Sequence, residues 1–168
     1  YYVRSLAIKE EIGDKSGMGG SLNNIGLVHA DIGDLDTALD YYTKSLAIYE
    51  EIGDKRGIGN ILTNIGIVYY YKGDYEQALD YLEKSFAIQK EISVKGIELA
   101  TTTSLYLTNK YLGKEFDEKE IYSLIKETEN IEFKTNLHLY QLLEDKSYLE
   151  TAYKQIQEKA DAMEDDLK

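Results

Sequence analysis

The chain of 168 residues contains no cysteine, no proline and no tryptophan. Without cysteine, disulfides and thiolate metal sites are excluded. Without proline, which breaks helix interiors, long uninterrupted helices are favoured. No apolar run approaches the roughly 20 residues that a membrane-spanning helix needs. Acidic residues outnumber basic ones by 31 to 19, and the net charge of −12 argues against nucleic acid and anionic membrane surfaces as partners. A partner attracted by charge should therefore be neutral or basic rather than acidic.

Catalytic and metal-binding constellations are missing as well. The two histidines, His29 and His138, are far apart in the sequence, and a lone histidine without cysteine or patterned acidic partners does not make a metal site. We expect His29 to be packed against its neighbours. The glycine-rich segment 13–20 lacks the Gly-Lys-Ser/Thr ending of a phosphate-binding loop. We therefore predict a protein that is not an enzyme and holds no cofactor and no metal.

The dominant feature that the chain does have is an internal repeat. Residues 1–40 and 41–80 align without a gap and share 24 of 40 positions. A third copy begins at Tyr81 and then diverges. A period of about 20–50 residues is typical of a solenoid, in which each unit buries its apolar face only against its neighbours. The repeat therefore indicates a binding scaffold.

Each copy is predicted to form two helices. In the second copy, apolar residues at spacings of three and four predict one helix over Lys55–Lys72 and another over Tyr75–Ile92. Gly73 suits the left-handed end of the first helix, and Asp74 suits the N-cap of the second. The first copy repeats this arrangement, so we expect an all-α fold.

Two glycines in the middle of predicted helices indicate close helix packing. Gly26 and Gly66 occupy the same register of the two copies, although a glycine inside a helix costs about 1 kcal/mol relative to alanine. We expect the paired helices to approach closely there, with Ala38 and Ala78 as the small residues that face them.

The two copies share a pattern of apolar and small residues at fixed spacing. The pattern consists of Leu22, Ile25, Gly26, His29, Gly33, Ala38, Tyr42 and Ser45, then Leu62, Ile65, Gly66, Tyr69, Gly73, Ala78, Leu82 and Ser85. This spacing resembles the tetratricopeptide repeat. The length of the copies and their lack of proline make them similar to the longer variant found in kinesin light chain, in spindle-orientation adaptors and in bacterial signalling proteins. The resemblance implies a right-handed α-solenoid whose first helices line a concave peptide-binding face.

The C-terminal third departs from the repeat. In the segment Lys95–Leu112, Tyr106 replaces the packing glycine. We predict further helices near 117–129 and 132–143 and a long one from about Ser147. We accordingly divide the chain into a tetratricopeptide array over 1–113 and a divergent helical cap over 114–168, continuous with the array.

The candidate peptide-binding residues lie on the faces of the first helices that the core does not use. Asn24 and Asn64 stand out, because an amide both donates and accepts hydrogen bonds and can hold the backbone of an extended peptide. In the long-repeat relatives an asparagine at a similar place forms such a ladder, which Ser104 would interrupt. The alternative is that these asparagines tie neighbouring helices together. The full candidate set is Asn23, Asn24, Leu27, Asp31, Asn64, Ile67, Tyr70, Tyr71, Ser104, Lys110 and Tyr111.

The last predicted helix carries a second pattern, an apolar stripe spaced 4, 3, 4, 3, 4. Such heptad spacing is typical of a coiled coil, so residues 147–168 either pack as a cap or form a homodimer. At the other end, residues 1–12 begin in the middle of a repeat and should expose Leu6, Ile8 and Ile12, which offers a second route to self-association. The stripe consists of Leu149, Tyr153, Ile156, Ala160, Met163 and Leu167.

Together these patterns predict a non-catalytic scaffold that binds a peptide or protein segment on its concave face. By analogy with the repeat style, we expect a regulatory fragment of a larger, bacterial and cytoplasmic signalling protein. The alternative is a self-assembly or dimerisation element that couples to a downstream output domain.

Overall fold

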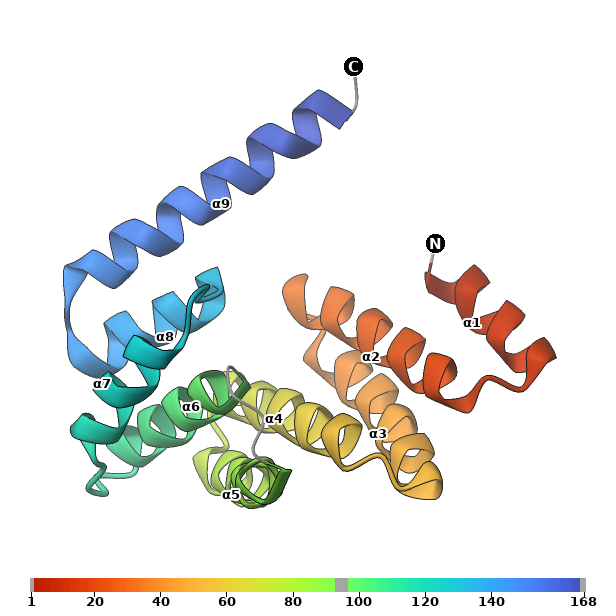
Figure 1. Ribbon diagram of the computed structural model, residues 1–168, viewed down its shortest axis with the longest axis horizontal. Coiled ribbons are helices and arrows are strands. Elements are labelled where there is room, and N and C mark those ends of the chain that lie inside the picture. The colour runs from red at the N-terminus through yellow and green to blue at the C-terminus, as the bar shows by residue number, and fades with distance from the viewer. Residues whose placement is uncertain (1, 93–96, 167–168) are drawn as a thin grey trace. The chain divides into compact units, whose positions relative to one another are not determined.

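The computed structural model describes residues 2–92 and 97–166, which fold into nine α-helices without a strand (Figure 1). The helices form two compact units, residues 1–94 and 95–168. Across the described residues, no helix has the length and the apolar character needed to span a bilayer. The helices are α1 (Tyr2–Ile12), α2 (Lys15–Asp31), α3 (Leu35–Ile52), α4 (Lys55–Lys72), α5 (Tyr75–Ile92), α6 (Ile97–Tyr111), α7 (Glu118–Glu127), α8 (Phe133–Leu143) and α9 (Lys146–Asp166).

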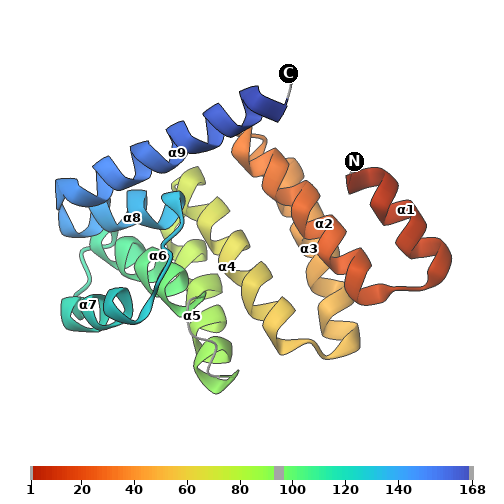
Figure 2. The ribbon, with the colours of Figure 1, turned by 45° about the horizontal axis from the view of Figure 1, so that its top comes forward.

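In the N-terminal unit, successive helices pack side by side from α1 to α5 (Figure 2). The helices α4 and α5 begin and end at the residues that the sequence predicted. The four connections share one chemistry, a glycine followed by an aspartate. Each of these glycines has a φ between 69° and 81°, where a side chain would be strained. Each aspartate accepts a hydrogen bond of 2.9–3.3 Å from the backbone N–H three residues later, as a helix N-cap does.

The two mid-helix glycines allow the close packing that the sequence predicted. A Cβ atom on Gly26 would lie 2.6 Å from the Tyr42 ring, and one on Gly66 would lie 2.6 Å from Cγ of Leu82. The facing groups are therefore larger than expected, because Tyr42 and Leu82 fill the space beside the glycines. Of the predicted small partners, Ala78 does face its glycine, with its backbone oxygen 3.2 Å from the Cβ position of Gly66.

Buried serines join the two helices of each copy. The hydroxyl of Ser45 donates to the carbonyl oxygen of Gly19 at 2.8 Å, and the hydroxyl of Ser85 donates to that of Gly59 at 2.7 Å. All four residues are buried, so each bond satisfies polar groups that water does not reach. The glycine-rich segments therefore serve helix packing, as their recurrence in both copies indicates.

In the C-terminal unit, α6 packs against α7 and α8, and α8 packs against α9. Tyr106, at the position of the packing glycine, donates a hydrogen bond from its hydroxyl to the Glu120 carboxylate. Its ring lies 5.6 Å from that of Phe116. Burial, the hydrogen bond to Glu120 and the nearby negative charges raise the pKa of Tyr106. An aromatic contact and a polar bond thus replace the close helix approach of the N-terminal unit.

The apolar stripe of α9 is partly exposed in the part that the structure describes. Leu149, Tyr153 and Ile156 are 39%, 70% and 49% exposed. The helix instead contacts α8 through another side, on which Ala152 is buried and Gln155 is half-buried. Both interpretations of the stripe, a cap and a homodimer contact, therefore stay predictions. The side chain of Met163 and all of Leu167 lie outside the described residues.

The first helix has an open face. Its Leu6 is half-buried, whereas Ile8 and Ile12 are exposed. The expectation of an open face on residues 1–12 is thus confirmed for the two isoleucines, and Leu6 is partly covered.

Candidate functional site

The candidate face lies on α2 and α4, the first helices of the two copies (Figure 2). These helices contact each other directly in the N-terminal unit. A short turn reverses the chain after α2 and again after α3. The helix α3 therefore runs in the opposite direction, and α2 and α4 run in the same direction. We call the surface formed by Asn23, Asn24, Leu27 and Asp31 of α2 with Asn64, Ile67 and Tyr71 of α4 the α2–α4 face.

A hydrogen bond between asparagine side chains links the two copies on this face. Nδ2 of Asn64 donates to Oδ1 of Asn23 at 2.9 Å. The alternative that Asn64 ties neighbouring helices together is therefore confirmed, with Asn23 as its partner. Asn24 is half-buried on the same helix. A side-chain amide has two N–H donors and two acceptor lone pairs, so one bond leaves capacity for a ligand.

Leu27 and Ile67 follow the asparagines along their helices, and both are half-buried. Leu27 packs against the core cluster that includes Tyr42, Ile61 and Ile65. These side chains thus place an apolar surface beside the asparagines, and the inner side of Leu27 also contributes to the core.

At the C-terminal ends of the two helices, Asp31 is exposed and Tyr71 is 52% exposed. Burial raises the pKa of Tyr71, and the negative charge of Asp31 raises it further. The same charge acts on Tyr42, whose pKa is raised mainly by burial. The Asp31 charge therefore acts on tyrosines of two helices, Tyr42 of α3 and Tyr71 of α4.

Tyr70, in contrast, is buried. Its ring lies 5.5 Å from the ring of Tyr71 and 5.6 Å from that of Tyr75. We therefore assign Tyr70 to the core of the N-terminal unit and not to the α2–α4 face.

The remaining three candidates belong to the C-terminal unit. Ser104 is buried, with its Oγ 3.4 Å from Nδ1 of His138. The Lys110 amine donates to the backbone oxygens of Gln141 and Leu142, both at 3.1 Å, and so binds the end of α8. Tyr111 is exposed. The structure thus gives Ser104 and Lys110 contacts within their own unit.

The two histidines differ in environment. His29 is half-buried and stacks on Tyr41 with ring centroids 5.6 Å apart, as its counterpart Tyr69 stacks on Tyr81 at 5.5 Å. This arrangement confirms the expected packed histidine. His138 is buried, and burial together with the charge of Lys134 lowers its pKa to about 4.

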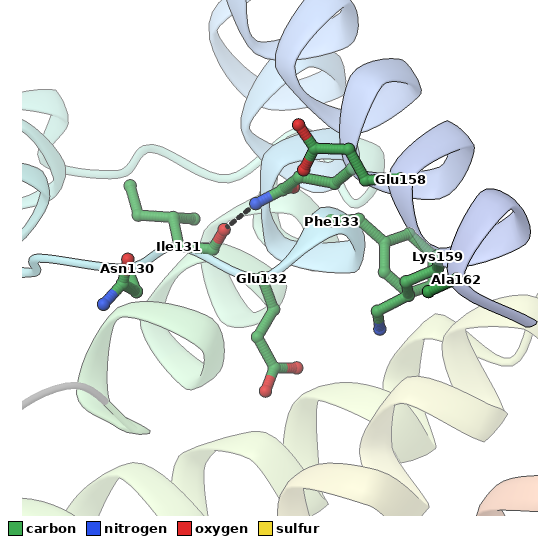
Figure 3. Close-up of a pocket in the computed structure, with 8 residues that line it drawn as sticks. Asn130, Ile131, Glu132, Phe133, Glu158, Lys159 and Ala162 are labelled. Carbon is green, nitrogen blue, oxygen red and sulfur yellow. Dashed lines mark hydrogen bonds between the residues drawn. The ribbon is translucent and has the colours of Figure 1, made fainter. Parts of the chain in front are cut away.

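A hollow of about 440 Å³ in the C-terminal unit lies between the segment before α8 and the second half of α9 (Figure 3). Nε2 of Gln155 donates to the backbone oxygen of Ile131 at 2.7 Å, and the Lys159 amine lies 4.8 Å from the ring centre of Phe133. The sequence did not predict this hollow, because no periodic pattern marks it. The Gln155 side chain is bonded within the fold, and we assign the hollow no chemistry.

The described residues contain no group of three or more histidine, aspartate or glutamate side chains that could hold a metal ion. The α2–α4 face likewise presents amide, apolar, phenol and carboxylate groups rather than a nucleophile paired with a base. Its arrangement suits recognition of another chain.

Comparison with known proteins identifies the repeats. Residues 17–91 match the family model described as tetratricopeptide repeat. No curated protein matches the chain. Among solved structures, BtubC (BKLC) from P. vanneervenii is similar with 19% identity and a TM-score of 0.59, over 74% of this chain and 51% of that one. The chain thus spans about half the length of BtubC.

A second similar structure is a chain described as a kinesin light chain with nearly identical TPR-like repeats, from Podosopora anserina. It shows 16% identity and a TM-score of 0.57, over 97% of this chain and 79% of that one. At these identities the two structures establish the fold, and the family model identifies the repeat. Residues 17–91 are therefore similar to the tetratricopeptide repeat, and the chain has an all-helical fold like that of the two solved structures.

Proposed function

We propose that this protein is a non-catalytic scaffold that binds an extended peptide or protein segment on the α2–α4 face. Tetratricopeptide repeats generally mediate protein–protein interactions, and the family is typically non-catalytic. The observation that carries the proposal is the amide pair formed by Asn23 and Asn64 across neighbouring repeats. It offers donors and acceptors for a peptide backbone beside half-buried apolar side chains.

The charge of the chain supports a neutral or basic partner. At a net charge of −12, an acidic peptide, nucleic acid or anionic membrane would be repelled. We assign the scaffold to the regulatory part of a larger cytoplasmic signalling protein, bacterial by its repeat style. This assignment rests on the resemblance of the repeats.

The test is a peptide-display screen against the full chain, followed by binding measurements on the double variant Asn24→Ala, Asn64→Ala. We expect the variant to lose binding while its circular dichroism retains the helical signal. Asn130→Ala, an exposed asparagine in the C-terminal unit, is the matched control and should bind normally. Selected peptides that bind the double variant unchanged would remove the α2–α4 face from the function.

A second candidate function is self-assembly through α9. Its support is the exposure of Leu149, Tyr153 and Ile156, because contiguous apolar surface on a helix favours association. The occupant would be α9 of a second copy. The stripe residues carry no charge, so two acidic chains could meet there without burying a charged side chain.

Because the chain lacks cysteine, a single introduced cysteine reports this contact cleanly. Oxidation of Ile156→Cys should give a disulfide-linked dimer if the stripes pair in parallel, whereas Thr151→Cys, on another side of α9, should remain monomeric. A chain that stays monomeric by light scattering over a hundredfold concentration range would exclude self-assembly. A dimer that persists in Ile156→Glu would move the contact to Ile8 and Ile12 of α1.

A further inference from the structure

The bond between Asn23 and Asn64 sets the register of α2 against α4. Each helical residue rises about 1.5 Å, and residues three or four apart share a face. Because the two helices run in the same direction, Leu27 and Ile67 form the next level, about 4.5–6 Å further along. The α2–α4 face therefore has an amide row followed by an apolar row.

One turn further, the same register brings Asp31 and Tyr71 to a third level. The Asp31 charge also raises the pKa of Tyr71, as this register leads us to expect. Both side chains are exposed. An aromatic ring attracts cations over its face, and a carboxylate offers several lone-pair sites to donors. The third row thus combines two groups that suit an ammonium or guanidinium.

Acidic side chains dominate the surroundings of this third row. Asp31 ends α2, and Asp34 and Asp36 follow it at the start of α3. The cation at the end of α4 is Lys72, which pairs with the Asp36 carboxylate. A basic side chain from a ligand would therefore complement the local charge as well as the net charge of the chain.

The spacing of the rows fits an extended peptide. An extended chain rises about 3.2–3.4 Å per residue, and alternate side chains point to the same side. Residues two positions apart are then about 6.6 Å from each other, close to the separation of the rows. An apolar side chain on the second row would place the residue two positions away on the third.

We propose that the α2–α4 face selects an extended segment in which an apolar residue and a lysine or arginine are separated by one residue. The Leu27–Ile67 row takes the apolar side chain, and the Asp31–Tyr71 row takes the basic one. The amide row holds the peptide backbone beyond them. This inference rests on the proposed function, and it names the ligand class and the residues that determine specificity.

The test begins with the peptides that display selects on the full chain. We expect enrichment of an apolar residue two positions from lysine or arginine. Asp31→Asn should lower the affinity of the chain for such a peptide about tenfold, the usual effect of losing a charged hydrogen bond. It should leave unchanged the affinity of an analogue with norleucine in place of the basic residue. Asp40→Asn, at an exposed aspartate on α3, removes the same charge and should have no effect.

A second variant, Tyr71→Ala, guards against an indirect effect of Asp31 on folding. It should also weaken the basic peptide more than the norleucine analogue, with the thermal unfolding of the chain recorded in parallel. Charge reversal by Asp31→Lys should shift the display toward glutamate or aspartate at the basic position.

The outcomes separate the inference from the proposed function. The selected peptides could fail to bind the Asn24→Ala, Asn64→Ala variant and yet carry no basic residue, or bind the Asp31→Asn variant with unchanged affinity. Either result would overturn the inference and leave the proposed binding face standing. A display that selects nothing, or peptides that ignore the asparagine variant, would overturn both.

Discussion

The two compact units are both built from packed helices but are held together differently. In residues 1–94, contacts recur at the repeat spacing: the ion pair Lys15–Glu51 returns as Lys55–Glu91. In residues 95–168, the principal contacts occur once, such as the binding of Lys110 to the end of α8. The periodicity of the sequence therefore predicts which side chains contact each other only where the same pair of helices is repeated along the chain.

The largest expected effect concerns the histidine of the C-terminal unit. The folded pKa of His138, about 4, lies below its ordinary value, so the unfolded chain binds a proton first as the pH falls. Stability should therefore be lost between about pH 6.5 and pH 4, by roughly 3 kcal/mol. The measurement is urea unfolding against pH for the native chain and for His138→Gln. The prediction is contradicted if the free energy of unfolding changes with pH by the same amount in the two chains across this range.

Its counterpart in the N-terminal unit is the half-buried His29. The His29→Gln chain should retain the steep loss of stability as the pH falls, because His138 is still present. A loss that follows His29 instead would show that the pH dependence belongs to the N-terminal unit.

The next effect tests the repeated close packing of the N-terminal unit. Gly66→Ala should lower the free energy of unfolding by about 1–3 kcal/mol through overpacking, because its Cβ would meet Leu82 at 2.6 Å. Gly20→Ala is the matched control, since its Cβ would meet only the Tyr49 hydroxyl at 3.6 Å. The control should gain up to about 1 kcal/mol in helix propensity. Equal effects of the two variants in urea unfolding would show that the register of the glycine is unimportant.

Helix caps offer a smaller contrast between the units. Asp54 caps α4 by accepting from the Gly57 N–H at 3.0 Å, so Asp54→Ala should cost about 1 kcal/mol. Glu132 precedes α8 and makes no side-chain cap bond, so Glu132→Ser should gain up to about 1 kcal/mol. Thermal unfolding of both variants measures the contrast. A loss in Glu132→Ser would mean that its side chain has another structural role.

The smallest effect concerns the repeated ion pairs. Both side chains of the Lys55–Glu91 pair are more than half exposed, and such surface pairs contribute about 0–1 kcal/mol. Lys55→Gln should therefore change the free energy of unfolding by less than about 0.5 kcal/mol, and its salt dependence should match that of the native chain. A larger loss in urea unfolding would show that this recurring pair contributes to repeat packing.

The sequence predicted the N-terminal helices well because glycine and aspartate mark each turn with local chemistry. It predicted the close approach at Gly26 but did not foresee that the Tyr42 ring provides the nearest atoms, since nothing local marks that ring as the group that fills the gap. It also named Asn64 without foreseeing Asn23 as its bonding partner. That bond depends on the relative rotation of two helices, which periodicity leaves open.

In the C-terminal unit, helix positions were predictable from apolar spacing, whereas partners were not. Lys110 was expected on the binding face because its register matched the repeat. The structure instead directs its amine to α8, because the helix packed there is not a repeat helix. The stripe on α9 shows the same limit, since heptad spacing identifies an apolar face without saying what covers it.

The most direct test of binding on the α2–α4 face is NMR chemical-shift mapping of the full chain with a peptide selected by display. We predict that the perturbed amide signals concentrate on α2 and α4, at Asn23, Asn64, Ile67 and Tyr71. Perturbations confined to α8 and α9, or to the outer face of α3, would contradict the assignment of binding to the α2–α4 face.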